Sequence, residues 1–134
     1  MEQRDHLKKQ IDDLAQVLGK LLTGLLQLKT EGTIQESLEL TNQTLKTALN
    51  QDLDELLAIP DKTFISDLKA RKIKNEAFDK LAEVFLVLAD NEGLSEKGKL
   101  MYKKSFLLLE KLESVEPIYS MDRHRKLERL KKLI

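Results

Sequence analysis

The sequence contains no cysteine and no tryptophan, and it has only two prolines and five glycines among its 134 residues. Without cysteine, the chain can form neither a disulfide framework nor a thiolate metal site. Aromatic residues, which favour strands, make up only 4% of the chain. Leucine, lysine and glutamate dominate instead, and these straight-chain residues favour helices. The composition therefore predicts an all-α protein.

Long apolar runs are also missing. The longest, residues 84–89, has six residues, whereas a helix that crosses a bilayer needs about 20. The first eight residues are rich in charge and lack the apolar region of a secretory signal. We therefore expect one cytoplasmic helical domain over residues 1–134, because this length suffices for a single hydrophobic core.

Neither sign of charge is in excess over the whole chain, which has 23 basic and 23 acidic residues. Residues 1–60 carry 6 basic and 10 acidic groups, however, and residues 61–134 carry 17 and 13, so the two parts have net charges of −4 and +4. Such a polarity can steer an encounter with an acidic partner or an anionic surface. Solvated helix faces also produce an asymmetry of this size.

Apolar residues recur at gaps of four and three from Leu7 onward, which is the spacing of one helix face. This helix should end near Gly32, where glycine would supply a left-handed C-cap. Thr33 and Glu36 have the spacing of a capping box that begins the next helix. Because so short a connector forces the helices to lie antiparallel, residues 1–51 are predicted to form a first hairpin.

The middle and end of the chain show similar signals. Residues 52–74 are predicted to form short connecting helices that Pro60 interrupts. A second hairpin is expected over residues 75–116, with its first helix the most buried of the protein and with Ser95 capping the return helix. A final helix should occupy residues 121–134, beyond the second proline.

Both hairpins carry small residues where their helices should cross. In the first, Leu21-x-x-Gly24-Leu25-x-x-Leu28 precedes Gly32-x-Ile34-x-x-Ser37-Leu38, and in the second, Ala82-x-x-Phe85-Leu86-x-x-Ala89 precedes Gly98-x-x-x-Tyr102. The pattern resembles tetratricopeptide repeats, although the diagnostic Trp and closing Pro are missing. The chain also resembles a group of small uncharacterised helical proteins of Gram-positive bacteria. These resemblances imply antiparallel helical hairpins packed as a short tetratricopeptide-like stack or as a right-handed helical bundle.

The motifs that could indicate an enzyme lack residues that the chemistry requires. The string from Gly93 to Leu100 has the spacing of a phosphate-binding loop, but Leu100 stands where a Ser or Thr hydroxyl would bind Mg²⁺. The two histidines, His6 and His124, lie at opposite ends of the chain and lack metal-binding spacing. We therefore expect no catalytic residue, no cofactor and no metal site.

The last predicted helix has the most unusual composition. It carries six basic residues against one acidic residue between positions 123 and 132, which gives a net charge of +5. A basic amphipathic helix can bind nucleic-acid phosphates or anionic lipid, or it can cap a helical stack with its leucines while its charges stay in water. The residues that would contact phosphate or an acidic partner are Arg123, Arg125, Lys126, Arg129, Lys131 and Lys132.

The preferred functional hypothesis is a non-catalytic protein–protein interaction or adaptor module, in which a groove between hairpins receives a segment of a partner protein. The alternative is a nucleic-acid-associated accessory protein that uses the basic C-terminal helix. The narrow stripe of Leu7, Ile11 and Leu14 would also suit pairing with a second copy in a homodimer.

Overall fold

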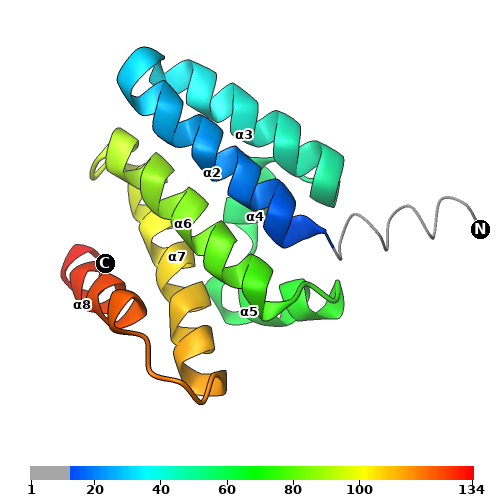
Figure 1. The fold of residues 1–134 in the computed structure, drawn as a ribbon, viewed down its shortest axis with the longest axis vertical. Coiled ribbons are helices and arrows are strands. Elements are labelled where there is room, and N and C mark those ends of the chain that lie inside the picture. The colour runs from blue at the N-terminus through cyan, green and yellow to red at the C-terminus, as the bar shows by residue number, and fades with distance from the viewer. Residues whose placement is uncertain (1–12) are drawn as a thin grey trace, which may run out of the picture.

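The computed structural model describes residues 13–134, which form seven helices and contain no strand. This confirms the predicted all-α class. The helices are α2 (Leu14–Glu31), α3 (Ile34–Leu49), α4 (Leu53–Ala58), α5 (Asp61–Ala70), α6 (Asn75–Glu92), α7 (Glu96–Val115) and α8 (Met121–Leu133), shown in Figure 1.

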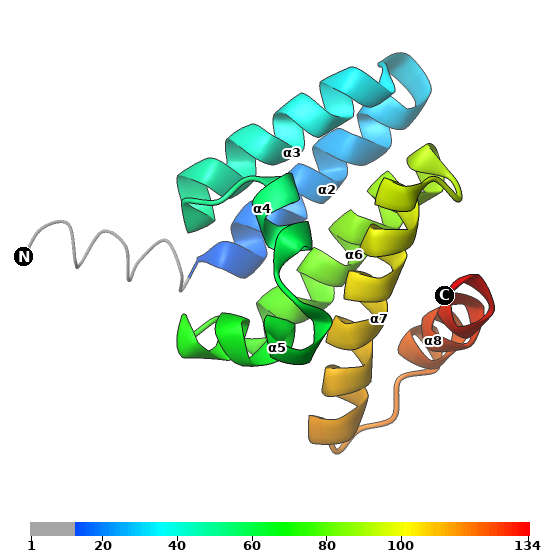
Figure 2. The same cartoon turned by 180° about the vertical axis from the view of Figure 1, so that it is seen from behind.

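Two helical hairpins make up most of the molecule. Helices α2 and α3 pack together as the first hairpin, and α6 and α7 pack together as the second. Helix α2 also lies against α6, so the two hairpins meet through their first helices (Figures 1 and 2). The short helices α4 and α5 connect the hairpins and contact α7, and α8 packs against α7 at the edge of the molecule.

The ends of the first hairpin show which local signals acted as expected. The capping box is present, because the Glu36 backbone N–H donates to Thr33 Oγ1 at 3.1 Å and the Thr33 N–H donates to Glu36 Oε1 at 3.3 Å. The predicted left-handed cap at Gly32 is wrong, since its backbone is extended at φ −124° and ψ −165°. A Cβ atom at Gly32 would lie 2.5 Å from Leu28 Cδ2, so a larger residue there would require the Leu28 side chain to move.

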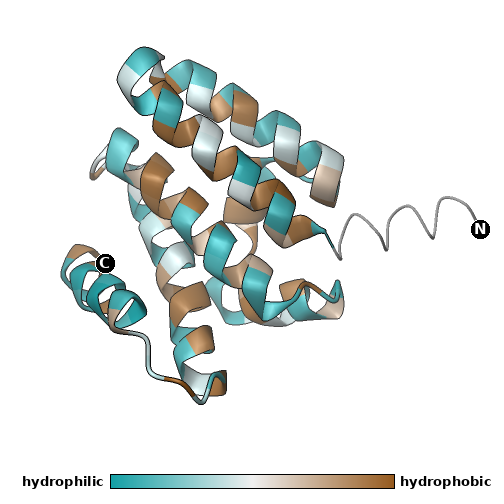
Figure 3. Ribbon diagram, in the orientation of Figure 1, coloured by the Kyte–Doolittle hydropathy of each residue, from teal (hydrophilic) through white to brown (hydrophobic). Residues whose placement is uncertain are grey.

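Helix α6 lies at the centre of the core. Nine of its 18 residues are buried, more than in any other described helix, as the sequence predicted. Where α6 and α7 cross, the Ser105 hydroxyl of α7 donates a hydrogen bond of 2.9 Å to the Ala82 carbonyl of α6. Figure 3 shows many apolar residues on α6 and α7, whereas α8 is largely hydrophilic. No helix among residues 13–134 is both long enough and apolar enough to span a membrane.

One charged side chain is part of this core. Lys104 of α7 is only 1% exposed, and its ammonium group donates to the Ile59 carbonyl at the end of α4. The same group forms an ion pair of 2.7 Å with Asp61 at the start of α5 and lies 4.8 Å from the centre of the Phe64 ring. Lys104 therefore holds the turn between α4 and α5 against α7.

We expect Lys104→Met to lower the free energy of unfolding by about 1–3 kcal/mol, because the Ile59 carbonyl would lose its donor. Urea denaturation followed by circular dichroism measures this loss. The matched control is Lys103→Met on the same helix, where the lysine is only partly buried and lies over the Phe106 ring. An equal loss in both variants would contradict the role assigned to Lys104.

Candidate functional site

Two features of the structure bear on function: the basic helix α8 and a groove beside it. Helix α8 packs against α7 through Leu127 and Leu130, which are 7% and 0% exposed. Two buried leucines are few for a helix of 13 residues. The contacts of its basic side chains therefore decide how firmly α8 is held and what its charges are free to bind.

Arg123 is the most buried of the six basic residues, at 7% exposure. Its guanidinium group donates to Glu113 at 2.7 Å and to Glu116 at 3.2 Å, both near the end of α7. The hydrogen bond to Glu113 is the main cause that raises the pKa of Arg123 above its ordinary value. This residue fastens the start of α8 to the end of α7.

Two further basic residues of α8 reach across to α6. Lys126 forms ion pairs of 3.1 Å with Glu83 and 2.9 Å with Asp122. Arg129 pairs with Asp90, whose carboxylate also accepts a hydrogen bond of 2.7 Å from the Tyr102 hydroxyl. The side chains at positions 123, 126 and 129 thus neutralise acidic groups of the second hairpin.

The remaining basic residues of α8 face away from the core. Lys131 pairs with Glu128 of the same helix at 3.3 Å. Arg125 and Lys132 are exposed and form no ion pair with any residue in the range 13–134. The structure therefore divides the six candidates into three that hold the fold together, one paired within α8 and two that are open to a ligand.

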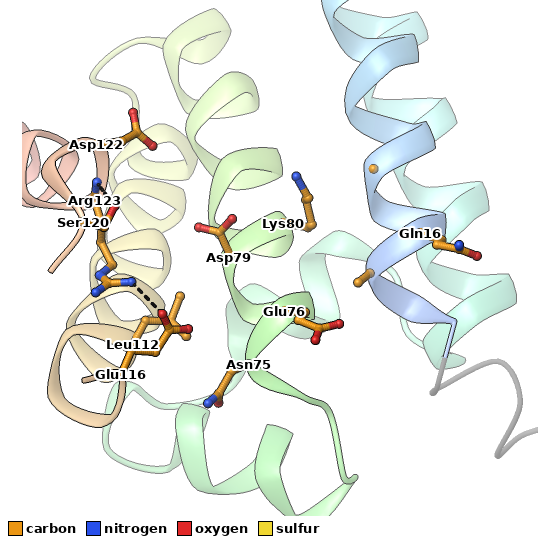
Figure 4. A pocket seen from close by; sticks show the side chains of 12 residues that line it. Gln16, Asn75, Glu76, Asp79, Lys80, Leu112, Glu116, Ser120, Asp122 and Arg123 are labelled. Atoms are coloured by element: carbon orange, nitrogen blue, oxygen red, sulfur yellow. Dashed lines mark hydrogen bonds and ion pairs between the residues drawn. The ribbon is translucent and has the colours of Figure 1, made fainter. Parts of the chain in front are cut away.

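A groove of about 650 Å³ lies across the exposed side of α6, between α2 and the start of α8 (Figure 4). Its polar lining carries more negative than positive groups. The four carboxylates are Glu76, Asp79, Glu116 and Asp122, and the two cations are Lys80 and Arg123. Arg123 already pairs with Glu116, and Asp122 already pairs with Lys126. Glu76, Asp79 and Lys80 remain, so the groove presents a net negative surface to a ligand.

Asp79 is the most informative residue of the groove. It is partly buried and forms no hydrogen bond or ion pair with any other described residue. Burial raises the pKa of its carboxyl, the nearby Glu83 raises it further, and Lys126 and Lys80 act in the opposite direction. Figure 4 shows its carboxylate on the side of α6 that faces α8, while Glu76 points toward α2.

The α2 side of the groove is formed by small and polar residues, Ala15, Gln16 and Gly19. Apart from the backbone of its own helix and its chain neighbours, a Cβ atom added at Gly19 would meet no atom of residues 13–134 within 4 Å. At Gly24, five residues further along, a Cβ would lie only 3.0 Å from Leu40 Cδ2 of α3. Gly24 thus permits close packing inside the first hairpin, whereas Gly19 leaves open space in the groove.

The sequence did not identify Asp79 as a candidate functional residue. Glu76, Asp79 and Glu83 recur at spacings of three and four, but surface helices often carry such a pattern, so it gave no reason to single out Asp79. The sequence also did not reveal that Leu14, a member of the stripe proposed for a homodimer, is fully buried inside the chain. The other two members, Leu7 and Ile11, lie outside the described residues.

No group of three His, Asp or Glu side chains within residues 13–134 is arranged to hold a metal ion. Comparison of the chain with protein-family models, with curated proteins and with solved structures gave no match.

The contacts of α8 lead to a stability prediction. Arg123→Met should lower the free energy of unfolding by about 1–3 kcal/mol, since Glu113 and Glu116 would lose their shared partner. Hydrogen exchange should speed up mainly in the amides of α8. Arg125→Met on the exposed face is the control and should stay within about 0.5 kcal/mol of the unchanged protein. If the amides of α8 exchange at the same rate in the unchanged protein, in Arg123→Met and in Arg125→Met, Arg123 does not fasten the helix.

Asp79 leads to a pH-dependent prediction. Its pKa is higher in the folded than in the unfolded chain, so ionisation of its carboxyl costs stability as the pH rises from its unfolded pKa through its folded pKa. Asp79→Asn should therefore raise Tm at pH 7, and the difference should shrink toward pH 3, where both proteins are neutral at this position. Thermal unfolding between pH 3 and pH 8 measures it, with Glu110→Gln on the exposed side of α7 as the control. A lower Tm for Asp79→Asn at pH 7 would contradict this account.

Proposed function

We propose that this protein is a non-catalytic protein–protein interaction module that binds a segment of a partner protein in the groove between α2 and α8. The observation that carries the proposal is the groove itself, which has a volume of about 650 Å³ and lies between the two hairpins. This volume falls within the range of protein ligand sites and suits a few residues of peptide.

The lining of the groove supports a peptide-like ligand. Gly19 and Ala15 leave room on the α2 side and contribute small apolar surfaces to the groove. Carboxylates on α6 and α8 add polar groups around these small surfaces. A mixture of apolar contacts with a few fixed polar groups is typical of sites that recognise both the shape and the charge of a ligand.

The basic helix has a structural part in this proposal. Its start supplies Ser120, Asp122 and Arg123 to the groove, and the ion pairs of Arg123, Lys126 and Arg129 hold it in place. The alternative function, binding of nucleic acid, has less support because these three cations are already neutralised. On α8, this function would have to rest on Arg125 and Lys132, together with Lys131 after release from Glu128.

Two finer points belong to the same proposal. The way α2 packs against both α3 and α6 supports a tetratricopeptide-like stacking of the two hairpins. The lack of cysteine is compatible with the cytoplasm of a bacterial cell, where we propose that the protein acts.

The proposal is tested by filling the groove without changing its charge. Gly19→Leu places a side chain into open space and also improves helix propensity, so the fold should be retained. Gln27→Leu puts the same residue on the exposed part of α2 outside the groove. The full-length protein and both variants are used in affinity capture from nuclease-treated native extract, followed by cross-linking and mass spectrometry.

We expect a protein that cross-links beside the groove and is captured by the unchanged chain and by Gln27→Leu, with at least about a tenfold loss for Gly19→Leu. Equal capture by both variants would place the binding surface elsewhere. If nucleic acid is recovered without nuclease and is lost on reversing the charges of Arg125 and Lys132, the alternative function is favoured, since affinity that comes from phosphate contacts falls with each lost cation.

A further inference from the structure

We propose that the partner segment presents a basic side chain, lysine or arginine, and that this side chain pairs with Asp79 in the groove. The inference rests on the proposed function, because it names the chemistry of the ligand for the same site. It starts from the partly buried carboxylate of Asp79, which has no hydrogen-bond or ion-pair partner among the described residues although it lies in a groove lined by cations and anions.

The two cations of α8 beside the groove already form ion pairs with other carboxylates. Arg123 is held by Glu113 and Glu116, and Lys126 is held by Glu83 and Asp122. Each of these two cations pairs with two carboxylates, so its positive charge is already balanced and neither forms an ion pair with Asp79.

The remaining cation of the groove is Lys80, the next residue of α6. Adjacent residues on a helix project about 100° apart and do not face each other. Figure 4 shows Lys80 on the side of α6 nearer α2 and the Asp79 carboxylate on the side nearer α8. The negative charge of Asp79 is therefore balanced by no direct contact within residues 13–134.

A cationic ligand would relieve the cost of this arrangement. Burying a carboxylate without a partner is unfavourable, and the neighbouring carboxylate of Glu83 adds repulsion. A lysine or arginine side chain that enters the groove supplies the missing charge, whereas a neutral side chain leaves Asp79 unpaired and an acidic one is repelled. Arginine suits the site best because its planar guanidinium can donate two hydrogen bonds to one carboxylate.

The same arrangement makes binding depend on pH. The charged groups around Asp79 are Glu76, Lys80 and Glu83 on α6, Asp122, Arg123 and Lys126 on α8, and Glu116 at the end of α7. Protonation of Asp79 removes the negative charge that attracts the ligand. Affinity should therefore increase as the pH rises through the pKa of Asp79, which lies above the ordinary value of an aspartate.

The test uses two short peptides that differ in charge alone. Acetyl-Ala-Arg-Ala-amide and its uncharged isostere, acetyl-Ala-citrulline-Ala-amide, are titrated into the ¹⁵N-labelled full-length chain at pH 7 and pH 4. We expect the arginine peptide to shift the amides around Asp79 on α6 and Gly19 on α2, and to bind at least about tenfold more tightly than the citrulline peptide at pH 7. Asp79→Asn should abolish this preference, and Glu110→Gln should leave it unchanged.

Three results would overturn the inference. Equal affinity of both peptides at the groove would support a peptide site but contradict the requirement for a basic side chain. A preference for arginine that survives in Asp79→Asn, or shifts confined to surfaces away from the groove, would assign the attraction to other carboxylates. Failure of the groove itself is judged separately, by the partner capture with Gly19→Leu. A Gly19→Leu titration with the arginine peptide adds a second check that does not remove any charge.

Discussion

The burial of α6 from several sides is the constraint that places the other helices. This helix buries nine of its 18 residues, and α2, α3 and α7 each cover part of it. At its crossing with α7, the small side chain of Ala82 lets Ser105 reach the α6 backbone. The side of α6 that stays uncovered, between α2 and α8, is the floor of the groove. The candidate site is thus a consequence of how the core is covered.

Helix α8 is attached in a different way from the rest. It buries two leucines against α7, and much of its remaining contact consists of ion pairs from Arg123, Lys126 and Arg129. Exposed ion pairs contribute little to stability, but Arg123 is 7% exposed and meets two carboxylates. The positive charge of α8 and the negative charge of the neighbouring hairpin are therefore complementary within one chain. A helix that looks like a phosphate-binding segment can in this way serve to complete a fold.

Asp79 stands apart from these satisfied charges. Glu83, Glu116 and Asp122 each meet a cation of α8. Asp79 is partly buried, has no ion-pair partner among residues 13–134, and has a raised pKa. A residue that lowers stability in the free protein is expected where function requires it, since natural proteins give up stability at their binding sites. The stability cost and the proposed binding role of Asp79 both follow from a partly buried carboxylate with no hydrogen-bond or ion-pair partner among residues 13–134.

The local signals of the chain predicted much of the fold, because they act over a few residues. The all-α class, the capping box at Thr33 and Glu36, and the cap at Ser95 depend only on neighbours in the sequence. The left-handed cap expected at Gly32 was wrong because the chain leaves α2 there in an extended conformation, which the presence of a glycine does not specify. Composition identified α8 as basic, but only the packing of α8 on the second hairpin decided which of its charges are neutralised. The groove joins residues from Ala15 to Arg123, and such distant groups meet only after the hairpins have packed.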